Sequence, residues 1–304
     1  MELNDLERRC LDAFRAGTDR TPRMEAETTD DWISFGLGLL LHSGALIRAS
    51  RLAQKKTDLG YKSDGSPVTR LENHIEQELR ERLKTFSPGA AVVGEETGGA
   101  LPSAGVAVAI DPVDGTWAFL SRTETLATVL AVFRDGAPFV GMVGNPVTGE
   151  IGYAARDVQT RLLQLSVLGE DDVASALPLP RLDSGITLVS VQPGRSTAPV
   201  IATLYEAWQG DRIGFVRSPG GSPSWALLEA AKGNYVYVNL WGRHPAYAFD
   251  LAAGVLLVRG AGGEVTDLNG APIDPVGHQG PLIAAVDDVA RDQVSELVRE
   301  AVSG

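Results

Sequence analysis

Apolar residues recur at helical spacing in several long segments of the chain. Residues 31–51 are mostly apolar and predict a buried helix. A second helix starts clearly, because Thr69 and Glu72 have the spacing of a capping box. Its apolar stripe repeats every four residues and consists of Leu71, Ile75, Leu79 and Leu83. Further helices are predicted over residues 222–232, 250–259 and about 290–302.

Short apolar runs bounded by turn residues predict β-strands. In the first half of the chain these runs cover residues 91–94, 106–110, 128–133, 138–143 and 151–155. The pairs Asp135-Gly136 and Thr148-Gly149 predict antiparallel connections between them. In the second half, the predicted helices alternate with strands at residues 186–191, 235–240 and 281–286. This order predicts a layered α/β (α+β) architecture.

The 304-residue length suits one large domain or two modest ones. Residues 169–184 are first acidic, then contain proline, and then become polar, so we predict a boundary between two subdomains there. We expect an N-terminal arm over residues 1–30, an N-terminal α+β subdomain over residues 31–180, and a C-terminal α/β subdomain over residues 181–304.

Charge and composition exclude several classes of protein. A net charge of −12 argues against a general nucleic-acid binder, which needs a basic surface. The single cysteine, Cys10, excludes an internal disulfide framework and indicates a reducing compartment. Residues 1–31 lack the apolar core of a secretory signal, and the apolar stretch 33–47 is too short to span a bilayer. We expect a cytoplasmic protein without a nucleic-acid or membrane partner.

Two carboxylates mark the most informative stretch of the chain, Asp111-Pro112-Val113-Asp114-Gly115-Thr116. Asp111 and Asp114 follow the predicted strand 106–110, where the chain is expected to turn. Hard oxygen ligands beside the exposed N–H groups of Gly115 and Thr116 suit a metal-assisted phosphate site. The same six residues are equally compatible with an ordinary Asp-Gly turn.

Other acidic residues occupy similar positions. Glu95 and Glu96 follow the strand 91–94, and Asp250 opens a predicted helix. If these acids converge at one sheet edge, they can hold two divalent ions roughly 3.5–4 Å apart for phosphoryl transfer. Oxygen ligands without a His/Cys cluster favour Mg²⁺ or Mn²⁺ over zinc. Simpler interpretations are a solvated turn at Glu95 and Glu96, and helix caps at Glu72, Thr116 and Asp250.

The joint order of these residues resembles the inositol monophosphatase superfamily of Mg²⁺-dependent, often lithium-sensitive sugar and nucleotide phosphatases. The resemblance runs from about residue 31 to the C-terminus. The main motifs that carry it are residues 94–96, 111–116, and 250–254 leading to Gly262-Gly263. Additional similarity is found at residues 64–69, 144–146 and 220–222. The resemblance implies the sugar-phosphatase fold, with alternating αβαβα layers, and a homodimer.

The resemblance also implies a role for each site residue. One Mg²⁺ would be held by Glu95, Asp111 and the Val113 carbonyl, and a second by Asp111, Asp114 and Asp250. A third, weaker ion would lie near Glu95, and Glu72 would reach it through water. Thr116 and Glu72 would orient or deprotonate the attacking water, with Glu95 completing the catalytic set. Substrate binding is assigned to Asp114, Gly115, Thr116, Gly221, Ser222 and Arg243.

The chain departs from the family pattern at several of these positions. Glu72 stands where family members usually have Asp, and its extra methylene moves the carboxylate relative to Thr116. Phe249 replaces a usual Trp, and Trp117-Ala118-Phe119 replaces a common x-Asn-Phe. Arg243 lies near the position of an acid that contacts sugar hydroxyls. Arg cannot accept hydrogen bonds but can bind a second anion, so we expect a substrate with an additional phosphate or carboxylate, unless Arg243 points to solvent.

The sequence therefore predicts a Mg²⁺-dependent phosphomonoesterase that acts on a small phosphorylated metabolite through metal-activated water. Inositol phosphates, histidinol phosphate, fructose bisphosphate and 3′-phosphoadenosine phosphate all stay open as substrates. The alternative is an inactive metal-binding or phosphometabolite-binding protein of the same fold. The aspartyl-phosphate phosphatases need Asp-x-Asp-Gly-Thr, and here Pro112 stands where that motif has its nucleophilic Asp. Neither a P-loop nor a Gly-x-Ser-x-Gly elbow occurs.

Overall fold

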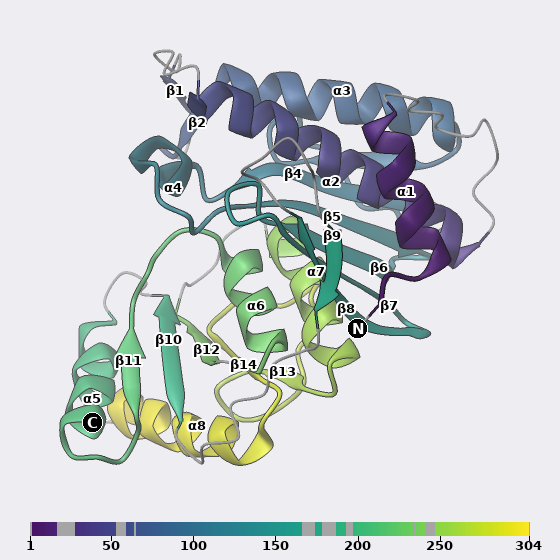
Figure 1. Cartoon of the computed structure of the whole chain (residues 1–304). Coiled ribbons are helices and arrows are strands. Elements are labelled where there is room, and N and C mark those ends of the chain that lie inside the picture. Colours follow the sequence, from purple (N-terminus) through teal and green to yellow (C-terminus); the bar gives the residue numbers. More distant parts are fainter. Residues whose placement is uncertain are drawn as a thin grey trace.

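The protein is built from five alternating layers, helix–sheet–helix–sheet–helix (Figure 1). The computed structural model describes residues 2–16, 28–52, 59–63, 65–165, 174–177, 187–192, 197–233, 235–240 and 247–303. Three buried apolar clusters fill the spaces between the layers. This arrangement confirms the layered α/β prediction and the αβαβα order that the family resemblance implied.

Three helices form the first layer: α1 (Asp5–Arg15), α2 (Thr29–Leu52) and α3 (Arg70–Phe86). They cover one face of a seven-stranded sheet in the order β3-β4-β5-β6-β7-β8-β9. Its strands are β3 (Ala91–Gly94), β4 (Val106–Asp114), β5 (Ala127–Arg134), β6 (Ala137–Gly144), β7 (Glu150–Ala155), β8 (Val158–Leu165) and β9 (Ala174–Leu177). β3 and β4 pair in parallel, and the other neighbours pair antiparallel.

The middle layer consists of α6 (Pro223–Ala231) and α7 (Tyr247–Gly260), which lie between the two sheets (Figure 1). Small residues let α7 approach the first sheet closely. A side chain at Gly141 of β6 would come within 2.8 Å of the Ala253 backbone. Leu227, Leu257 and Val258 bury their side chains in the same apolar cluster as residues of both sheets. This helical layer is therefore shared by the two sheets.

The second sheet has the strand order β11-β10-β12-β14-β13. Its strands are β10 (Leu188–Gln192), β11 (Phe215–Arg217), β12 (Val236–Asn239), β13 (Glu264–Thr266) and β14 (Leu282–Ala285). The helices α5 (Ala198–Gln209) and α8 (Asp288–Ser303) cover its outer face. Two short elements border the candidate site: the hairpin of β1 (Leu59–Tyr61) and β2 (Pro67–Thr69), and the helix α4 (Thr116–Ser121).

Helix α2 is longer than the apolar stretch that predicted it. It has 24 residues and is long and apolar enough to cross a membrane by length and composition, so the expectation that this segment is too short was wrong. In the structure most of its apolar side chains are buried between the sheet and the neighbouring helices (Figure 1). Phe35 stacks on Phe86 of α3 with ring centroids 4.1 Å apart, and Trp32 meets Phe86 edge-on. These contacts confirm the predicted buried helix.

Helix α1 lies within the predicted N-terminal arm and is fixed to the first sheet by a buried carboxylate. Glu7 has no exposed surface. It accepts hydrogen bonds from Arg161 of β8 at 2.6 and 2.8 Å and from the Tyr153 hydroxyl of β7 at 2.7 Å. Burial alone would raise the pKa of Glu7, but the bonds from Arg161 and Tyr153 lower it below its usual value. The ion pair between Glu7 and Arg161 therefore anchors α1 to the first sheet.

Several predicted elements have different bounds in the structure. Strand β4 continues through Pro112 to Asp114, with irregular register after Asp111, so the chain turns at Gly115 and not at Ile110. Helix α7 begins at Tyr247, so Asp250 lies in its first turn. Sequence reasoning did not predict the strands β1, β2, β8, β9, β11 and β13 or the helix α5. Most of the proposed boundary at residues 169–184 lies outside the described residues, and the subdomain division stays a prediction.

Candidate active site

The two aspartates of the Asp-Pro-Val-Asp segment end strand β4 and are both buried. Asp111 accepts the Val113 N–H at 2.9 Å, which folds the segment over its own carboxylate. Asp114 accepts the Ser222 hydroxyl at 2.5 Å and the Ser224 N–H at 2.9 Å. Ser222 and Ser224 open helix α6, so Asp114 connects the first sheet to the middle layer. The chain does turn at Asp114-Gly115, but both aspartates are buried and hydrogen-bonded, unlike those of a solvated Asp-Gly turn.

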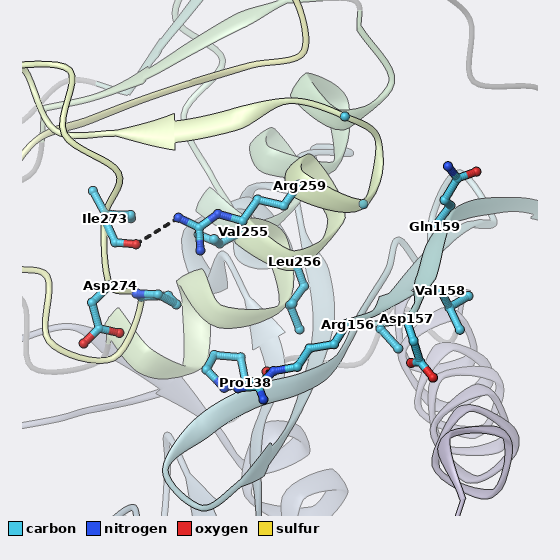
Figure 2. A pocket seen from close by; sticks show the side chains of 14 residues that line it. Pro138, Arg156, Asp157, Val158, Gln159, Val255, Leu256, Arg259, Ile273 and Asp274 are labelled. Carbon is cyan, nitrogen blue, oxygen red and sulfur yellow. Dashed lines mark hydrogen bonds between the residues drawn. The ribbon is translucent and has the colours of Figure 1, made fainter.

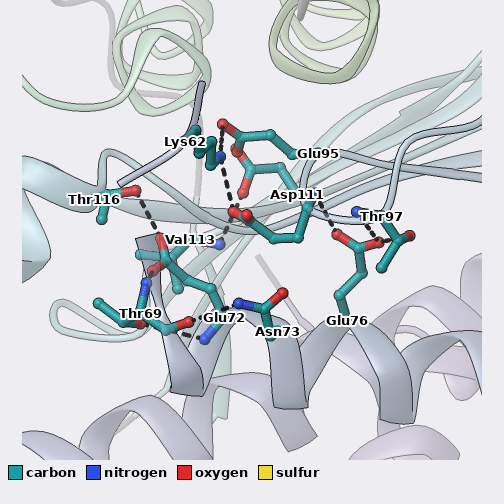
Figure 3. Close-up of polar contacts among 11 residues, drawn as sticks. Lys62, Thr69, Glu72, Asn73, Glu76, Glu95, Thr97, Asp111, Val113 and Thr116 are labelled. Carbon is teal, nitrogen blue, oxygen red and sulfur yellow. Dashed lines mark hydrogen bonds and ion pairs between the residues drawn. The ribbon is translucent and has the colours of Figure 1, made fainter. Parts of the chain in front are cut away.

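Thr116 and Glu72 meet although they lie 44 residues apart in the sequence. The Thr116 hydroxyl donates to Glu72 Oε1 at 2.6 Å, while Glu72 Oε2 accepts the Thr69 N–H at 2.5 Å (Figure 3). Glu72 therefore completes its capping box and still reaches Thr116 with its other oxygen. The longer side chain of Glu reaches the hydroxyl, although family members usually have Asp there. Gly115, with φ +95°, is the N-cap of α4, and Thr116 is its first helical residue.

Glu95 and Glu96 lie in the turn after β3 and hold a lysine between them. Lys62 Nζ is 2.7 Å from Glu95 Oε1 and 2.9 Å from Glu96 Oε1. The Glu96 side chain is only 3% exposed, and that of Glu95 is 21% exposed, which excludes the solvated turn. Figure 3 shows Glu95, Asp111 and Glu72 converging with Lys62 from separate elements.

These groups influence each other's protonation. Burial raises the pKa of Glu96 to about 7 against the attraction of Lys62, and repulsion from Glu95 and Glu72 adds to the rise. Burial also raises the pKa of Glu72 and of Asp114, and the Glu95 charge contributes to both shifts. Burial alone would lower the pKa of Lys62, but attraction to Glu95 and Glu96 raises it. The acids share one electrostatic environment that favours a bound cation.

The donor chemistry of this cluster fits Mg²⁺. All the side-chain donors are carboxylate oxygens, which are ligands that Mg²⁺ prefers, and the Lys62 ammonium already lies among them as a cation. The described residues contain no group of three or more His, Cys, Asp or Glu side chains already arranged to hold an ion. The side chain of the proposed ligand Asp250 and all of Arg243 lie outside the described residues. Their predicted roles stay predictions.

The predicted phosphate and substrate residues Gly115, Gly221 and Ser222 lie together. The Ser222 N–H donates to the Thr125 carbonyl at 2.9 Å. A Cβ at Gly115 would lie 3.0 Å from Ser222 N and 3.1 Å from Thr125 O, and its φ already requires glycine. The Ser222 hydroxyl also caps α6 by accepting the Trp225 N–H at 2.8 Å. The structure therefore gives the Ser222 hydroxyl two partners within the protein.

Sequence reasoning missed residues that surround the proposed ligands. They are Lys62, Glu76, Thr125 and Ser224. One of them left a signal in the sequence: Glu76 follows Glu72 by one helical turn, next to the apolar stripe of α3, where a buried acid needs partners. For Lys62 and Thr125 no local pattern indicated the contact.

A cavity of about 660 Å³ lies away from this cluster. Figure 2 shows it between the C-terminal half of α7, the β7–β8 turn and the loop at Ile273. Arg259 in its wall already donates to Glu264 and to the Ile273 carbonyl, and Arg156 donates to the Pro138 carbonyl. None of the predicted site residues lines this cavity. The candidate active site is therefore the acidic cluster and not the cavity.

Comparison with known proteins gives consistent matches along most of the chain. Residues 29–303 match the model of the Inositol monophosphatase family. A histidinol-phosphatase of Mycobacterium tuberculosis is 31% identical over 241 residues, covering 77% of this chain and 85% of that protein. The inositol-1-monophosphatase ImpA of Mycolicibacterium smegmatis is 30% identical over 235 residues, covering 73% and 77%. A solved IMPase of Thermotoga maritima shares the fold, with a TM-score of 0.72, 21% identity, and coverage of 90% and 98%.

Proposed function

The chain belongs to the inositol monophosphatase family and is a phosphoric monoester hydrolase, and we propose that it hydrolyses a small phosphorylated metabolite with Mg²⁺ as cofactor. The observation that carries this proposal is the 2.6 Å hydrogen bond from Thr116 to Glu72. It places a hydroxyl with a carboxylate behind it in the same cluster as Asp111 and Glu95 (Figure 3). A hydroxyl held by a base beside metal-binding oxygens suits the activation of water.

The proposed ligands follow the donor chemistry of the site. Glu95, Asp111 and the Val113 carbonyl would hold one Mg²⁺, and Asp111, Asp114 and Asp250 would hold a second. A third, weaker ion near Glu95 is part of the same proposal, and Mn²⁺ can take the place of Mg²⁺ with these oxygen donors. When bound, the ions supply positive charge that stabilises the phosphoryl and leaving oxygens.

The chain's own residues orient the attacking water and receive its proton. The Thr116 oxygen accepts the proton of the water while the Thr116 hydroxyl gives its own to Glu72 Oε1. Burial raises the pKa of Glu72, which brings this base closer to neutral pH. The N–H groups of Gly115 and Thr116 bind the phosphate, and Asp114 keeps this turn against α6 through Ser222.

A substrate panel tests the reaction and its specificity. The panel contains inositol 1-phosphate, histidinol phosphate, fructose 1,6-bisphosphate, 3′-phosphoadenosine 5′-phosphate and an aryl phosphate. The relatives named as a histidinol-phosphatase and an inositol-1-monophosphatase make the first two the primary candidates. Phosphate release is measured with Mg²⁺, with Mn²⁺, and after EDTA treatment. We expect EDTA to inactivate the protein and Mg²⁺ to restore it.

Two outcomes would contradict this proposal. No phosphate release from any ester by the folded protein would favour a binding protein of the same fold over an enzyme. Equal turnover with and without EDTA would remove the metal from the mechanism.

Thr116→Val keeps the side-chain volume but removes the hydroxyl, and we expect a loss of about 10²–10⁴-fold in kcat if Thr116 and Glu72 transfer the proton.

The proposal includes a cytoplasmic homodimer that needs no nucleic acid or membrane. The family resemblance suggests the dimer, and the acidic charge and single cysteine suggest the compartment. Size-exclusion chromatography with light scattering tests the dimer, because a monomer of 32.2 kDa is easily distinguished from twice that mass. Fractionation of the producing cells tests the compartment and membrane association together.

A further inference from the structure

Glu76 on α3 is a fully buried carboxylate outside the proposed set of catalytic and metal-binding residues. It lies one helical turn after Glu72 and points toward the turn that follows β3 (Figure 3). That turn carries Glu95, the proposed metal ligand. A buried carboxylate is costly unless hydrogen bonds compensate for the lost water, so its partners show what it holds.

The partners of Glu76 are consecutive residues of the turn. Glu76 Oε2 accepts the Glu96 N–H at 2.8 Å, and Oε1 accepts the Thr97 N–H at 3.2 Å. The Thr97 hydroxyl donates to the same Oε1. Backbone N–H groups converge on one carboxylate only in a particular backbone conformation. Glu76 therefore fixes the conformation of the turn immediately after Glu95.

Arg80 holds the same turn from its two ends. Its Nε donates to Glu76 Oε1 at 3.0 Å, which compensates the buried negative charge. Its Nη1 donates to the Val92 carbonyl at 3.2 Å and its Nη2 to the Gly98 carbonyl at 3.0 Å. Val92 lies in β3 before the turn and Gly98 lies after it. Glu76 and Arg80 together therefore contact the backbone on both sides of Glu95.

The sequence of the turn is adapted to this pair. A Cβ on Gly94 would collide with the Glu76 carboxylate, so glycine is required for the close approach. Gly94 and Gly98 exchange backbone hydrogen bonds of 3.1 and 2.9 Å that close the turn. In contrast, the side-chain hydrogen bond that the structure gives for Glu95 goes to Lys62. Lys62 therefore holds the end of the Glu95 side chain, while the turn fixed by Glu76 and Arg80 holds its backbone.

We propose that Glu76 and Arg80 form a clamp that positions Glu95 for metal binding. The inference rests on the proposed function, because Glu95 is a ligand only if the protein uses a divalent ion. Glu76 and Arg80 are positioning residues, since neither is assigned a contact with substrate or ion. Partners of this kind typically change metal affinity about 10- to 100-fold when they are replaced.

The test compares Glu76→Gln with the wild type and with Glu78→Gln as the matched control. Glu78 is on the same helix and loses the same charge, but its side chain contacts His42 and His74 and not the turn. In Glu76→Gln an amide NH₂ group replaces one of the carboxylate oxygens. This NH₂ group faces the N–H donors of the turn, and a donor cannot accept a hydrogen bond from it. Mg²⁺ binding is measured by calorimetry on the folded proteins, and thermal unfolding confirms that each variant is folded.

We expect Glu76→Gln to bind Mg²⁺ about 10- to 100-fold more weakly, with Glu78→Gln unchanged. With the best substrate, the Mg²⁺ concentration for half-maximal rate rises by the same factor. The value of kcat at saturating Mg²⁺ stays near that of the wild type. If Glu76→Gln is not folded, Thr97→Val decides, because Thr97 is an exposed residue and the change removes only the hydroxyl that donates to Glu76. A smaller loss of Mg²⁺ affinity is expected.

Unchanged Mg²⁺ affinity in folded Glu76→Gln would overturn the clamp and leave the proposed function intact. If Thr97→Val is the deciding variant, unchanged affinity there has the same meaning. A wild type that binds no Mg²⁺ and releases no phosphate would instead overturn the proposed function, and the clamp with it. Loss of kcat at saturating Mg²⁺ without weaker binding would also contradict a role in positioning Glu95.

Discussion

Replacing Ser222 tests whether one hydroxyl connects the proposed ligand Asp114 to helix α6. The Ser222 hydroxyl donates to the buried Asp114 at 2.5 Å and accepts the Trp225 N–H at 2.8 Å as the N-cap of α6. Ser222→Ala removes both bonds. A hydrogen bond to a charged group contributes about 1.5–3 kcal/mol, and loss of an N-cap costs about 1 kcal/mol. We therefore expect the free energy of unfolding to fall by about 3 kcal/mol.

A second substitution at the same position separates the two contributions. Ser222→Gly also removes the bond to Asp114, but glycine is tolerated at an N-cap with a loss of only a few tenths of a kcal/mol. We expect Ser222→Gly to lose somewhat less stability than Ser222→Ala. The difference between the two variants then estimates the value of the cap.

Urea unfolding followed by tryptophan fluorescence measures both variants, and Ser121→Ala serves as the control. The Ser121 hydroxyl donates to carbonyls within its own short helix and contacts neither Asp114 nor α6. The control should change stability by less than about 0.5 kcal/mol. Losses below about 1 kcal/mol in both Ser222 variants would refute the reasoning, because the bond to Asp114 would then contribute nothing measurable.

Further predictions address the site, the anchoring of α1, and specificity. Asp111→Asn should abolish phosphate release without unfolding the protein, because Asp111 is assigned to two ions; retained turnover would contradict that role. The lowered pKa of Glu7 stabilises the fold above its unfolded-state pKa near 4.5, and this contribution is lost as pH falls through the folded-state value. Glu7→Gln should therefore cost about 2 kcal/mol at pH 7 and show a weaker acid dependence of urea unfolding; an unchanged profile would exclude the charged anchor. Arg243→Ala should raise KM for a doubly anionic ester and spare a singly anionic one, and equal effects would remove the second-anion hypothesis. Li⁺ titrated at fixed Mg²⁺ should inhibit phosphate release, and insensitivity would show that the lithium response of the family is absent here.

Local sequence was sufficient wherever the determining contacts are local. The capping box at Thr69 and Glu72 lies within one helical turn and appears in the structure with both of its bonds. The Asp135-Gly136 pair forms the predicted connection between β5 and β6, with positive φ at both residues. The apolar run predicted a strand that ends at Ile110, but β4 continues to Asp114, and Pro112 lies in its irregular stretch, where a missing N–H is tolerated.

The acidic cluster could be predicted as a set of residues but not as a geometry. Glu95, Asp111 and Thr116 were identified by their order along the chain, whereas the partners of Glu95 and Thr116 come from distant segments. Lys62 reaches Glu95 across 33 residues, and nothing near Lys62 in the sequence indicates that contact. The three-residue strand β11 was missed because so short a run carries no readable period.

The helical layer between the sheets has a consequence for biosynthesis. Strands β4 to β8 are complete once residue 165 has left the ribosome, but the helices that shield their inner face, α6 and α7, span residues 223–260. Ala131, Val143 and Leu162 therefore stay uncovered on the nascent chain until roughly a hundred more residues emerge. A truncated product that stops before α6 should therefore be prone to aggregation and should depend on chaperones, even if its early strands have paired.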